Sequence, residues 1–348
     1  MSNPAEPRTT PEAVAADDEG VIASGCGTAI SGVAANGKPL VSVITPAYNE
    51  EKYLSDCIES VLAQTYEHWD YLIVDNRSTD RTLEIARYYA QNDHRVRVHT
   101  NDEFVPVMKN FNTAFRSISK DAKYCKVVGG DDRLHPQCLE KMVATAERHP
   151  SAAIVGSYGV YGERVEPIGP PFPREIVSGR EACRNYLIGQ PYFFGTPTIL
   201  LYRADVVRRR ARFFCEDYLH ADLAACFTCL EENDFAFCHE ILSFNREREG
   251  SLTSTAQLYN RYILEHLSVL KEFGPTYLDN ITTKKQIRWT SAALYRNLGR
   301  RLCSGLGREY WEAQRKQFAT FDQEICRVRV ALHACLCLLE TAAGRLRW

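Results

Sequence analysis

The feature that most constrains the fold of this chain is a regular alternation of two hydrophobic patterns between residues 39 and 161. Short apolar runs rich in β-branched residues, typical of buried parallel strands, alternate with longer segments that have helical spacing. The expected strands are residues 41–45, 71–74, 96–99, 124–128 and 152–161, and the expected helices are residues 50–64, 83–89, 106–118 and 136–149. This alternation predicts an α/β fold with a doubly wound, mostly parallel sheet.

The segments on either side of this alternation differ from it in composition. Residues 1–38 are rich in Ala, Gly, Ser, Pro and acids, show no periodicity, and are expected to be a disordered leader. The alternating region and a later strand at residues 235–244 are expected to form one domain over residues 39–252. Beyond it, three segments have helical spacing and no strand follows, which predicts a helical C-terminal appendage over residues 253–348; these segments are residues 256–273, 283–301 and 309–339.

The overall charge argues against a nucleic-acid-binding role. The chain has 42 Lys and Arg residues against 44 Asp and Glu, a net charge of -2, so it lacks a basic field that would attract nucleic acid. Its first residues are polar and acidic, without the apolar core of a signal peptide. No run approaches the roughly 18 consecutive apolar residues of a membrane-spanning helix. We therefore expect a cytoplasmic protein, either soluble or peripheral at the inner face of the membrane.

The cysteines support the same location. There are 13 of them, an odd number without a repeated spacing, which suits a reducing compartment. Cys226 and Cys229 form a C-x-x-C pair inside a segment with helical spacing. Without a second such pair, they are expected to be core residues of a helix rather than a redox or zinc site.

The last segment, residues 328–348, combines leucines and arginines at helical spacing. Leu332, Leu336 and Leu339 alternate with basic residues that include Arg329 and Arg345. A basic amphipathic helix of this kind suits a membrane surface. It equally suits a helix that packs on the protein core and exposes a basic face to solvent. The sequence leaves both interpretations open.

Polar residues gather where three of the expected strands end. Ligands of open α/β sheets bind beyond the carboxyl ends of the strands. The first strand is followed by TPAYNE at residues 45–50, the second by DNRSTD at residues 75–80, and the fourth by GGDD at residues 129–132. A proline and a tyrosine at a strand end could form a flat shelf for a nucleotide base. The carboxylate of Asp75 could accept a hydrogen bond from a base ring N–H or from a ribose hydroxyl.

Asp131 and Asp132 are the most specific of these signals. Two carboxylates preceded by glycines, which allow close approach of the backbone, suit Mn²⁺ or Mg²⁺ bridging a diphosphate. Such a cation would neutralise the charge that develops on a leaving nucleoside diphosphate. An isolated pair of aspartates is more often a helix cap or a solvated loop. The position of this pair after a series of alternating strands and helices favours the metal site.

Taken in order, residues 39–50, 71–80 and 129–139 resemble the motifs of family-2 glycosyltransferases of the GT-A fold. The resemblance extends from about residue 39 to residue 251, and Arg77 stands where the family usually has glycine. It implies an inverting enzyme that transfers a sugar from a nucleotide-diphosphate donor to an acceptor hydroxyl, in the assembly of cell-surface polysaccharide or glycolipid. UDP is the carrier that the family favours, with GDP and dTDP open, and the acceptor would be a saccharide or a lipid-linked molecule.

The resemblance also implies roles for individual residues. Asp132, together with Asp131, would hold the metal, and the nucleotide pocket would be lined by Pro46, Tyr48, Glu50, Asp75, Asn110 and Asp131. Residues 195–197 fall where relatives build an acceptor-side loop over the donor. Relatives often have a metal-binding histidine near the position of Arg248; an arginine cannot ligate a metal, but it could bind diphosphate oxygens.

Inverting transfer needs a general base that removes the proton of the acceptor hydroxyl. The family places this acid at the start of a late helix, where the chain has Glu216, Asp217 and Asp222. Asp222 is favoured because it begins an amphipathic segment that leads into the strand at residues 235–244. Asp217 is the other candidate, because Glu216 and Asp217 match the acidic pair of the family; Asp217 could also only cap the helix.

Two other classes of protein compete with this interpretation. A nucleotidyltransferase would have a glycine-rich, basic loop after the first strand, and residues 45–50 contain neither glycine nor a basic residue. The second alternative is a catalytically inactive GT-A-like scaffold or binding protein. The intact carboxylates at Asp75, Asp131 and Asp132 argue against it, whereas the missing histidine argues for it.

Overall fold

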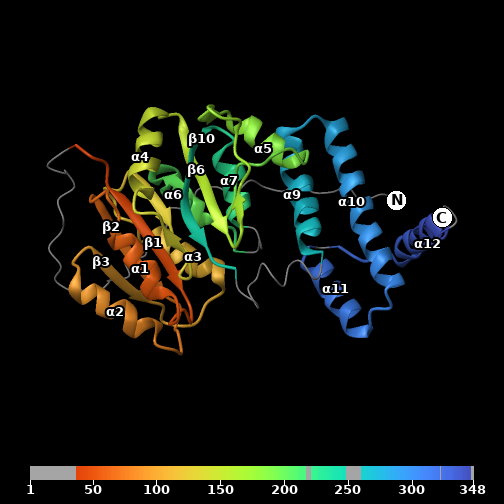
Figure 1. Ribbon diagram of the computed structural model, residues 1–348, viewed down its shortest axis with the longest axis horizontal. Coiled ribbons are helices and arrows are strands. Elements are labelled where there is room, and N and C mark those ends of the chain that lie inside the picture. Colours follow the sequence, from red (N-terminus) through yellow and green to blue (C-terminus); the bar gives the residue numbers. More distant parts are fainter. Residues whose placement is uncertain (1–36, 217–220, 248–259, 322, 346–348) are drawn as a thin grey trace, which may run out of the picture. The chain divides into compact units, whose positions relative to one another are not determined.

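The computed structural model describes residues 37–216, 221–247, 260–321 and 323–345 of the chain. Within these ranges, residues 41–245 build a ten-stranded sheet whose strand order is β3-β2-β1-β4-β9-β6-β10-β5, with β7 paired to β6 and β8 paired to β10 (Figure 1). The strands are β1 (Val41–Ala47), β2 (Trp69–Asp75), β3 (Val96–Thr100), β4 (Tyr124–Val127), β5 (Arg133–Leu134), β6 (Ala152–Tyr161), β7 (Arg164–Glu166), β8 (Ile176–Val177), β9 (Leu200–Arg203) and β10 (Asp234–Asn245).

The parallel half of the sheet confirms the fold expected from the alternation. β1 pairs in parallel with β2 and β4, and β2 pairs in parallel with β3. All seven residues of β2 are buried. Helices on both faces exclude water from such a strand, so its sequence is nearly continuous in apolar residues. β6 and β10, on the other side of the sheet, are parallel to each other as well.

β9 was not expected from the sequence, and it joins the two parallel halves. It pairs antiparallel with both β4 and β6. A strand of four residues after a segment rich in Pro and Gly is too short to show a clear period. Because Leu201 is paired with Lys126 of β4, the residues before β9 lie beside the carboxyl end of β4. This short strand therefore brings residues 195–199 to the edge where the acidic pair follows β4.

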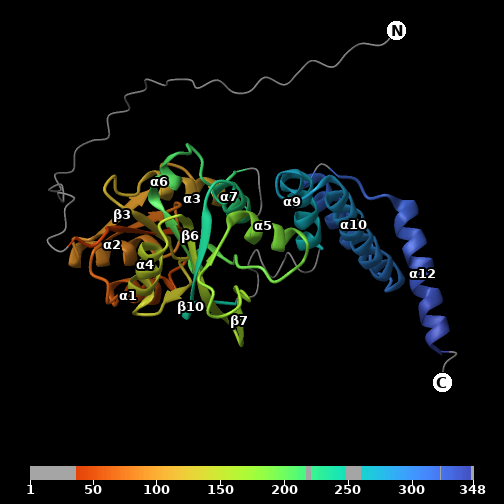
Figure 2. The same ribbon diagram turned by 90° about the horizontal axis from the view of Figure 1, so that it is seen from above.

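Helices cover both faces of the sheet, as Figure 2 shows from above. One face is covered by α1 (Leu54–Leu62), α2 (Thr82–Asn92) and α4 (Cys138–Arg148), which share a hydrophobic cluster with β1. The other cluster contains residues of α3 (Val107–Arg116), α5 (Gly179–Leu187), α6 (Ala204–Arg208) and α7 (Ala221–Cys229). α1 begins later than expected because residues 51–53 form a turn, with Asn49 before them at a positive φ of 54°.

The residues after the sheet form helices, as expected, but one expected boundary is wrong. α9 (Arg261–Tyr277) and α10 (Asn280–Cys303) match two of the expected segments, whereas residues 309–339 form two helices, α11 (Arg308–Thr320) and α12 (Arg327–Arg345). α11 ends where the carbonyl of Phe318 accepts hydrogen bonds from the N–H groups of Phe321 and Gln323, which turns the chain. Phe318 is buried in a cluster with Leu264 of α9, Leu298 of α10 and Val330 of α12.

The expected domain limits stay predictions, because residues 1–36 and 248–259 lie outside the described residues. In the ranges that are described, no helix has the length and apolar character needed to cross a bilayer.

The cysteines fall into two groups by environment. Of the twelve in the described ranges, seven are buried, Cys337 is partly exposed, and four are exposed, namely Cys215, Cys303, Cys326 and Cys335. Cys226 and Cys229 are both buried in α7, in agreement with the expected role of the C-x-x-C pair as core residues. Burial raises the pKa of a thiol because it penalises the thiolate, and it brings the pKa of Cys57 to about 12.

Candidate active site

The carboxyl ends of β1, β2 and β4 meet at one edge of the sheet. Ala47 at the end of β1 is paired with Asp75 at the end of β2, and the backbone N–H of Asn76 donates to the carbonyl of Ala47 at 2.9 Å. Glu50, after β1, lies against the loop after β4: a Cβ atom added to Gly130 would be 3.0 Å from Cγ of Glu50. The three motifs expected to build a nucleotide site are therefore neighbours in space.

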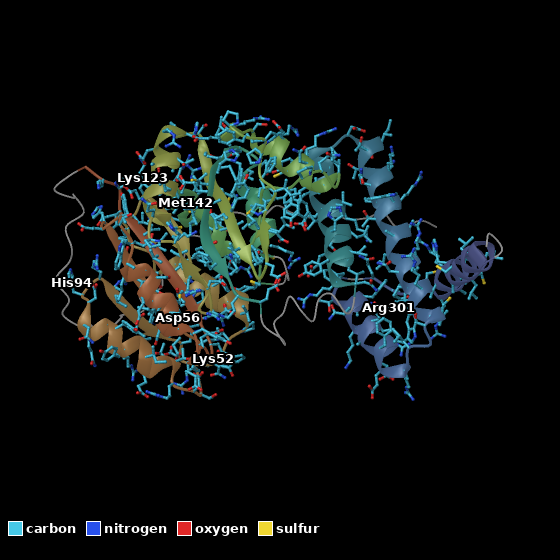
Figure 3. All side chains as sticks on the ribbon, viewed as in Figure 1. Lys52, Asp56, His94, Lys123, Met142 and Arg301 are labelled. Atoms are coloured by element: carbon cyan, nitrogen blue, oxygen red, sulfur yellow. The ribbon has the colours of Figure 1, made fainter. Side chains whose placement is uncertain are left out.

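The end of β10 reaches the same edge. Lys52 and Asp56 mark this end of the sheet in Figure 3, whereas Lys123, the residue before β4, lies at the opposite end. Arg246, the residue after β10, pairs with Asp56 at 3.6 Å, and its guanidinium lies 4.1 Å from the ring centroid of Tyr53. The same side chain donates through Nε to the backbone carbonyl of Asp131 at 3.2 Å.

Asp132 is a buried acid of this edge, with 9% of its surface exposed. Its Oδ2 accepts a hydrogen bond from the hydroxyl of Thr198 at 2.5 Å, and its Oδ1 accepts one from the backbone N–H of Arg246 at 3.1 Å. Burial raises the pKa of Asp132 to about 6, and the negative charges of Asp131 and Glu50 act in the same direction. A cation bound here would lower that pKa again.

Thr198 connects Asp132 to the residues before β9. Its hydroxyl donates to Asp132 and accepts a hydrogen bond from the backbone N–H of Gly129 at 3.0 Å. Its carbonyl accepts a short hydrogen bond from Nζ of Lys126, a fully buried lysine of β4 that also donates to the carbonyl of Leu200 at 3.2 Å. Burial lowers the pKa of Lys126. Lys126 thus fixes the segment before β9, and Thr198 in that segment holds the Asp132 carboxylate.

Asp75 is fully buried at the end of β2, and one of its oxygens lacks a partner among the described residues. Its Oδ1 accepts a hydrogen bond from the backbone N–H of Ser78 at 3.2 Å, whereas its Oδ2 has none. A buried carboxylate oxygen without a hydrogen bond is costly, so such a group needs a reason such as a bound ligand. A ligand that satisfied this oxygen would have to donate a hydrogen bond from an N–H or an O–H group.

Two exposed aromatic rings stand close to Asp75. Tyr48 follows β1, Phe104 follows β3, and their ring centroids are 4.9 Å apart at an interplanar angle of 58°. Both side chains are exposed, as expected of rings that stack on a ligand rather than on the core. Pro46, also expected at this site, belongs to β1 and is partly exposed. Arg77 has a φ of 61°, in the left-handed region where the family's usual glycine would be unstrained.

The side chain of Asn110 is part of a buried network, and the donor contact expected of it stays a prediction. Its Oδ1 accepts from the side chain of Asn101 at 2.8 Å, and Asn101 also donates to Asn76 at 2.9 Å. Asn76 in turn bonds to the backbone N–H of Val105 at 3.0 Å and to its carbonyl at 2.8 Å. The network fixes the loop that carries Phe104. In this structure, therefore, Asn110 supports the site through that loop.

The candidates for the general base lie at or just before α7. Asp222 is half-buried, its Oδ1 accepts from the N–H of Leu223 at 2.8 Å, and burial raises its pKa to about 6. Glu216 accepts a hydrogen bond from the side chain of Asn112 at 3.0 Å, which connects this segment to α3. Asp217 and Arg248 lie outside the described residues.

Sequence reasoning missed three residues of this edge: Thr198, Phe104 and Arg246. Thr198 directly follows the loop at residues 195–197 that the family resemblance singled out, so its neighbours gave a partial signal. Phe104 lies in a loop without a motif, and Arg246 depends on where β10 ends. For the last two, only the three-dimensional arrangement shows that they lie at this edge.

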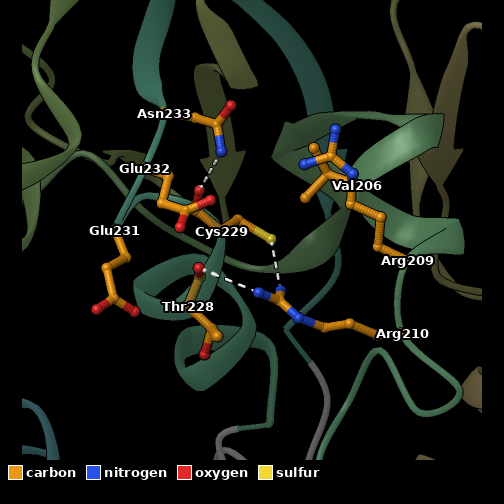
Figure 4. Close-up of a pocket in the computed structure, with 8 residues that line it drawn as sticks. All are labelled: Val206, Arg209, Arg210, Thr228, Cys229, Glu231, Glu232 and Asn233. Atoms are coloured by element: carbon orange, nitrogen blue, oxygen red, sulfur yellow. Dashed lines mark hydrogen bonds between the residues drawn. The ribbon is translucent and has the colours of Figure 1, made fainter. Parts of the chain in front are cut away.

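A cavity of about 150 Å³ lies at the other end of the sheet (Figure 4). It is lined by residues of α6 and just after it, and by the end of α7 with the residues that follow. Arg210 donates to the sulfur of Cys229 at 3.4 Å and to the carbonyl of Thr228 at 3.2 Å, which satisfies groups at the C-terminal end of α7. Asn233, also in its lining, comes just before β10, at the amino end of that strand. The cavity is therefore separate from the candidate active site.

The sheet, the acidic pair after β4, the acid at the end of β2 and the aromatic pair define the class of protein: an enzyme with the GT-A fold of glycosyltransferases. Solved structures agree on the fold. S. aureus TarS residues 1–349, in complex with UDP-GlcNAc, matches with a TM-score of 0.59 at 19% sequence identity, over 81% of this chain and 80% of that chain. The mannosyltransferase PcManGT from Pyrobaculum calidifontis, in complex with GDP-Man and Mn²⁺, matches with a TM-score of 0.50 at 15% identity, over 85% and 86% of the two chains.

The family follows from sequence comparison. Residues 42–210 match the model of glycosyl transferase family 2. The putative glycosyltransferase EpsE of Bacillus subtilis (strain 168) is 31% identical over 217 residues, 58% of this chain and 76% of EpsE. The putative teichuronic acid biosynthesis glycosyltransferase TuaG of the same organism is 32% identical over 155 residues, 44% of this chain and 61% of TuaG. The chain belongs to glycosyltransferase family 2 and is a glycosyltransferase.

Proposed function

We propose that this glycosyltransferase transfers a sugar from a UDP-sugar to an acceptor hydroxyl with inversion at the anomeric carbon. The observation that supports a nucleotide whose base has a ring N–H is the buried Oδ2 of Asp75, which has no partner among the described residues. Uracil carries a ring N–H that can donate to this oxygen, and the rings of Tyr48 and Phe104 provide a stacking surface next to it. Thymine and guanine also have a ring N–H, whereas cytosine does not.

The acids after β4 fit a hard divalent cation, Mn²⁺ or Mg²⁺. Within the described residues, no group of three or more His, Cys, Asp or Glu side chains could hold a metal. This agrees with a cation held by only one or two carboxylates together with substrate phosphates, as Mg²⁺ usually is. Asp132, with Asp131, would hold it, and when bound it would stabilise the negative charge on the departing UDP. Arg248 is proposed to bind diphosphate oxygens.

We propose that the general base is Asp222 or Asp217. Asp222 is supported by its pKa of about 6, because a carboxylate with a raised pKa accepts a proton more readily and is still ionised at neutral pH. Asp217 is supported by its neighbour Glu216, which Asn112 holds against α3, the helix that begins beside the asparagine network. The acceptor oxygen, once its proton moves to the base, attacks the anomeric carbon from the side opposite UDP.

A row of hydroxyl and amide groups beside the acidic pair suits a saccharide acceptor. The hydroxyls of Tyr161 and Thr196 are 2.8 Å apart, and Thr196 donates to Asn245 at 2.9 Å. Neutral hydroxyl and amide groups can both donate and accept hydrogen bonds, and such groups recognise sugar hydroxyls. Since the name of TuaG refers to teichuronic acid biosynthesis, we propose a role in cell-surface polysaccharide or glycolipid assembly, on a saccharide or lipid-linked acceptor. We place the reaction in the cytoplasm, where free thiols remain reduced.

Nucleotide binding is the first test. Thermal unfolding is measured with UDP, GDP, dTDP or CMP, each with Mn²⁺ or with EDTA, for the wild type, Asp75→Ala, Asp132→Ala and the control Asp121→Ala, an exposed acid far from the site. A nucleotide at about 100 times its Kd adds roughly 2.7 kcal/mol of stability. We expect UDP with Mn²⁺ to stabilise the wild type and the control only. Equal stabilisation by CMP would contradict the role of Asp75, and absence of stabilisation by any nucleotide would contradict the donor site.

The identity of the base is tested with Asp222→Asn and Asp217→Asn. The variant that lacks the base should lose turnover by about 10²–10⁴-fold and keep its UDP affinity, while the other variant keeps both. If Asp222 is the base, kcat/KM of the wild type should fall below pH 6, since the protonated acid cannot accept a proton. If both variants retained turnover, neither Asp222 nor Asp217 would be the general base. An unchanged anomeric configuration in the product would refute inversion, and UDP binding without any turnover would favour the inactive scaffold.

A further inference from the structure

The charge of the C-terminal helices differs sharply from that of the rest of the chain. Residues 280–348 contain 13 basic and five acidic residues, a net charge of +8, within a chain of net charge -2, so residues 1–279 carry -10. α10 alone has six basic residues and no acid, and all six are exposed: Lys284, Lys285, Arg288, Arg296, Arg300 and Arg301. Like charges at helical spacing repel one another. Such a helix gains stability when a negatively charged surface is bound to it.

These six side chains are not neutralised within the described part of the molecule. Among the described residues, the ion pairs involve basic residues of the sheet region, of α9 and of α11. None of these ion pairs involves a basic residue of α10. The charges of α10 are therefore available for an external partner.

Apolar side chains are exposed on the same face of α10. Ile281 and Trp289 are 82% and 69% exposed, and they lie at intervals of four residues with Lys285 between them. Arg296 falls on the same face, two turns further on. An exposed tryptophan flanked by basic residues is typical of helices that lie in the headgroup region of a bilayer.

α12 has two apolar faces, and packing accounts for only one of them. Val330 and Ala334 are buried, and Ala334 packs against α10 so closely that a Cβ atom on Gly299 would be 2.7 Å from its backbone nitrogen. A second face exposes more than half of each of its four large apolar side chains: Val328, Leu332, Leu336 and Leu339. Their intervals of four, four and three residues place them on one stripe of the helix.

We propose that the exposed faces of α10 and α12 form a docking surface for a membrane that contains anionic lipids. The arginines and lysines would bind the lipid phosphates, while Trp289 and the leucine stripe of α12 would enter the boundary between headgroups and acyl chains. Self-association through this surface is disfavoured, because it would bring together two surfaces of high positive charge. This inference goes beyond the proposed reaction and does not depend on it.

The test is co-sedimentation of the full chain with phosphatidylcholine vesicles that contain or lack phosphatidylglycerol. The wild type should bind only the vesicles with phosphatidylglycerol, and binding should weaken at high salt. Each basic residue near an anionic surface adds roughly fivefold to partitioning, so Lys285→Gln combined with Arg288→Gln should bind about 30-fold more weakly. The matched control, Arg87→Gln with Lys120→Gln, removes the same charge from exposed sites of the sheet region and should bind like the wild type.

The apolar contribution is tested separately with Leu332→Ser combined with Leu336→Ser, and with Ile168→Ser as an exposed control of the sheet region. The double variant should lose most of its vesicle binding, and the control should not. Absence of wild-type binding to anionic vesicles would overturn the proposal, as would equal losses in variants and controls. If the wild type self-associates but does not bind vesicles, and the leucine variant no longer self-associates, the surface is instead an interface between copies of this chain. UDP binding, measured on the same samples, reports on the active site independently.

Discussion

Asp132 should destabilise the protein in the absence of metal, so Asp132→Asn should raise its Tm at neutral pH. Burial brings the pKa of this acid from 3.8 to about 6. At about 1.4 kcal/mol for each pKa unit, ionised Asp132 costs roughly 3 kcal/mol of folding free energy. Asparagine avoids this cost but weakens the hydrogen bond from Thr198, worth about 1.5 kcal/mol. The expected net gain is about 1–2 kcal/mol, or a few degrees in Tm.

The pH dependence of the gain follows from the sign of the pKa difference. The pKa of Asp132 is higher in the folded protein than in the unfolded chain, so the folded protein binds more protons between about pH 4 and pH 6. The contribution of Asp132 to stability therefore decreases as the pH rises through this interval, and the full cost is present above it. The advantage of the Asn variant should be largest at neutral pH and should vanish below about pH 4.

Scanning calorimetry in EDTA over this pH range measures the effect, with Asp131→Asn as the control. Asp131 is only half-buried, so its replacement should change Tm little. Adding UDP with Mn²⁺ should reverse the order, because only the wild type has the carboxylate that binds the cation. An Asn variant that is less stable than the wild type in EDTA would refute the reasoning, and so would a gain that does not change with pH.

Three further changes test the surroundings of the site. Thr198→Val removes the hydroxyl that holds Asp132 and should weaken metal-dependent UDP binding by about tenfold in calorimetric titrations, whereas Thr198→Ser should restore it; equal affinities of the two variants would contradict this role. Phe104→Ala should weaken UDP binding roughly tenfold through lost stacking, in contrast to Tyr88→Ala at another exposed ring. Arg77→Gly should relieve the left-handed conformation and add about 0.5–1 kcal/mol in urea denaturation, a gain that Arg77→Ala, equally strained, should not show.

The sequence predicted the parallel half of the fold because burial and periodicity coincide there. β2 is buried along its whole length, so its apolar run is unambiguous. β9 has only four residues, and its place between β4 and β6 depends on pairing with distant segments that leave no local pattern. The break between α11 and α12 was missed for a similar reason. Residues 321–326 contain neither Gly nor Pro, and the turn there follows from the packing of Phe318.

The site was predictable to the extent that its residues directly follow strands. Asp75 and Asp132 could be singled out because parallel strands bring their carboxyl ends to one edge. Thr198 and Phe104 join them only through the antiparallel strand β9 and the loop after β3. The role of Asn110 was transferred by resemblance and stays a prediction; the structure adds that its amide oxygen accepts a hydrogen bond from Asn101.

Because some cysteines are exposed and others are buried, their reaction with an alkylating reagent can report on unfolding. Cys303, Cys326 and Cys335 are exposed on or beside the C-terminal helices, whereas thiols such as those of Cys57 and Cys125 are enclosed by the sheet and its helices. An alkylating reagent should label the first group at once and reach the second only when the sheet opens. Mass spectrometry of the labelled peptides would then time the opening of the catalytic sheet apart from that of the helices, without any introduced probe.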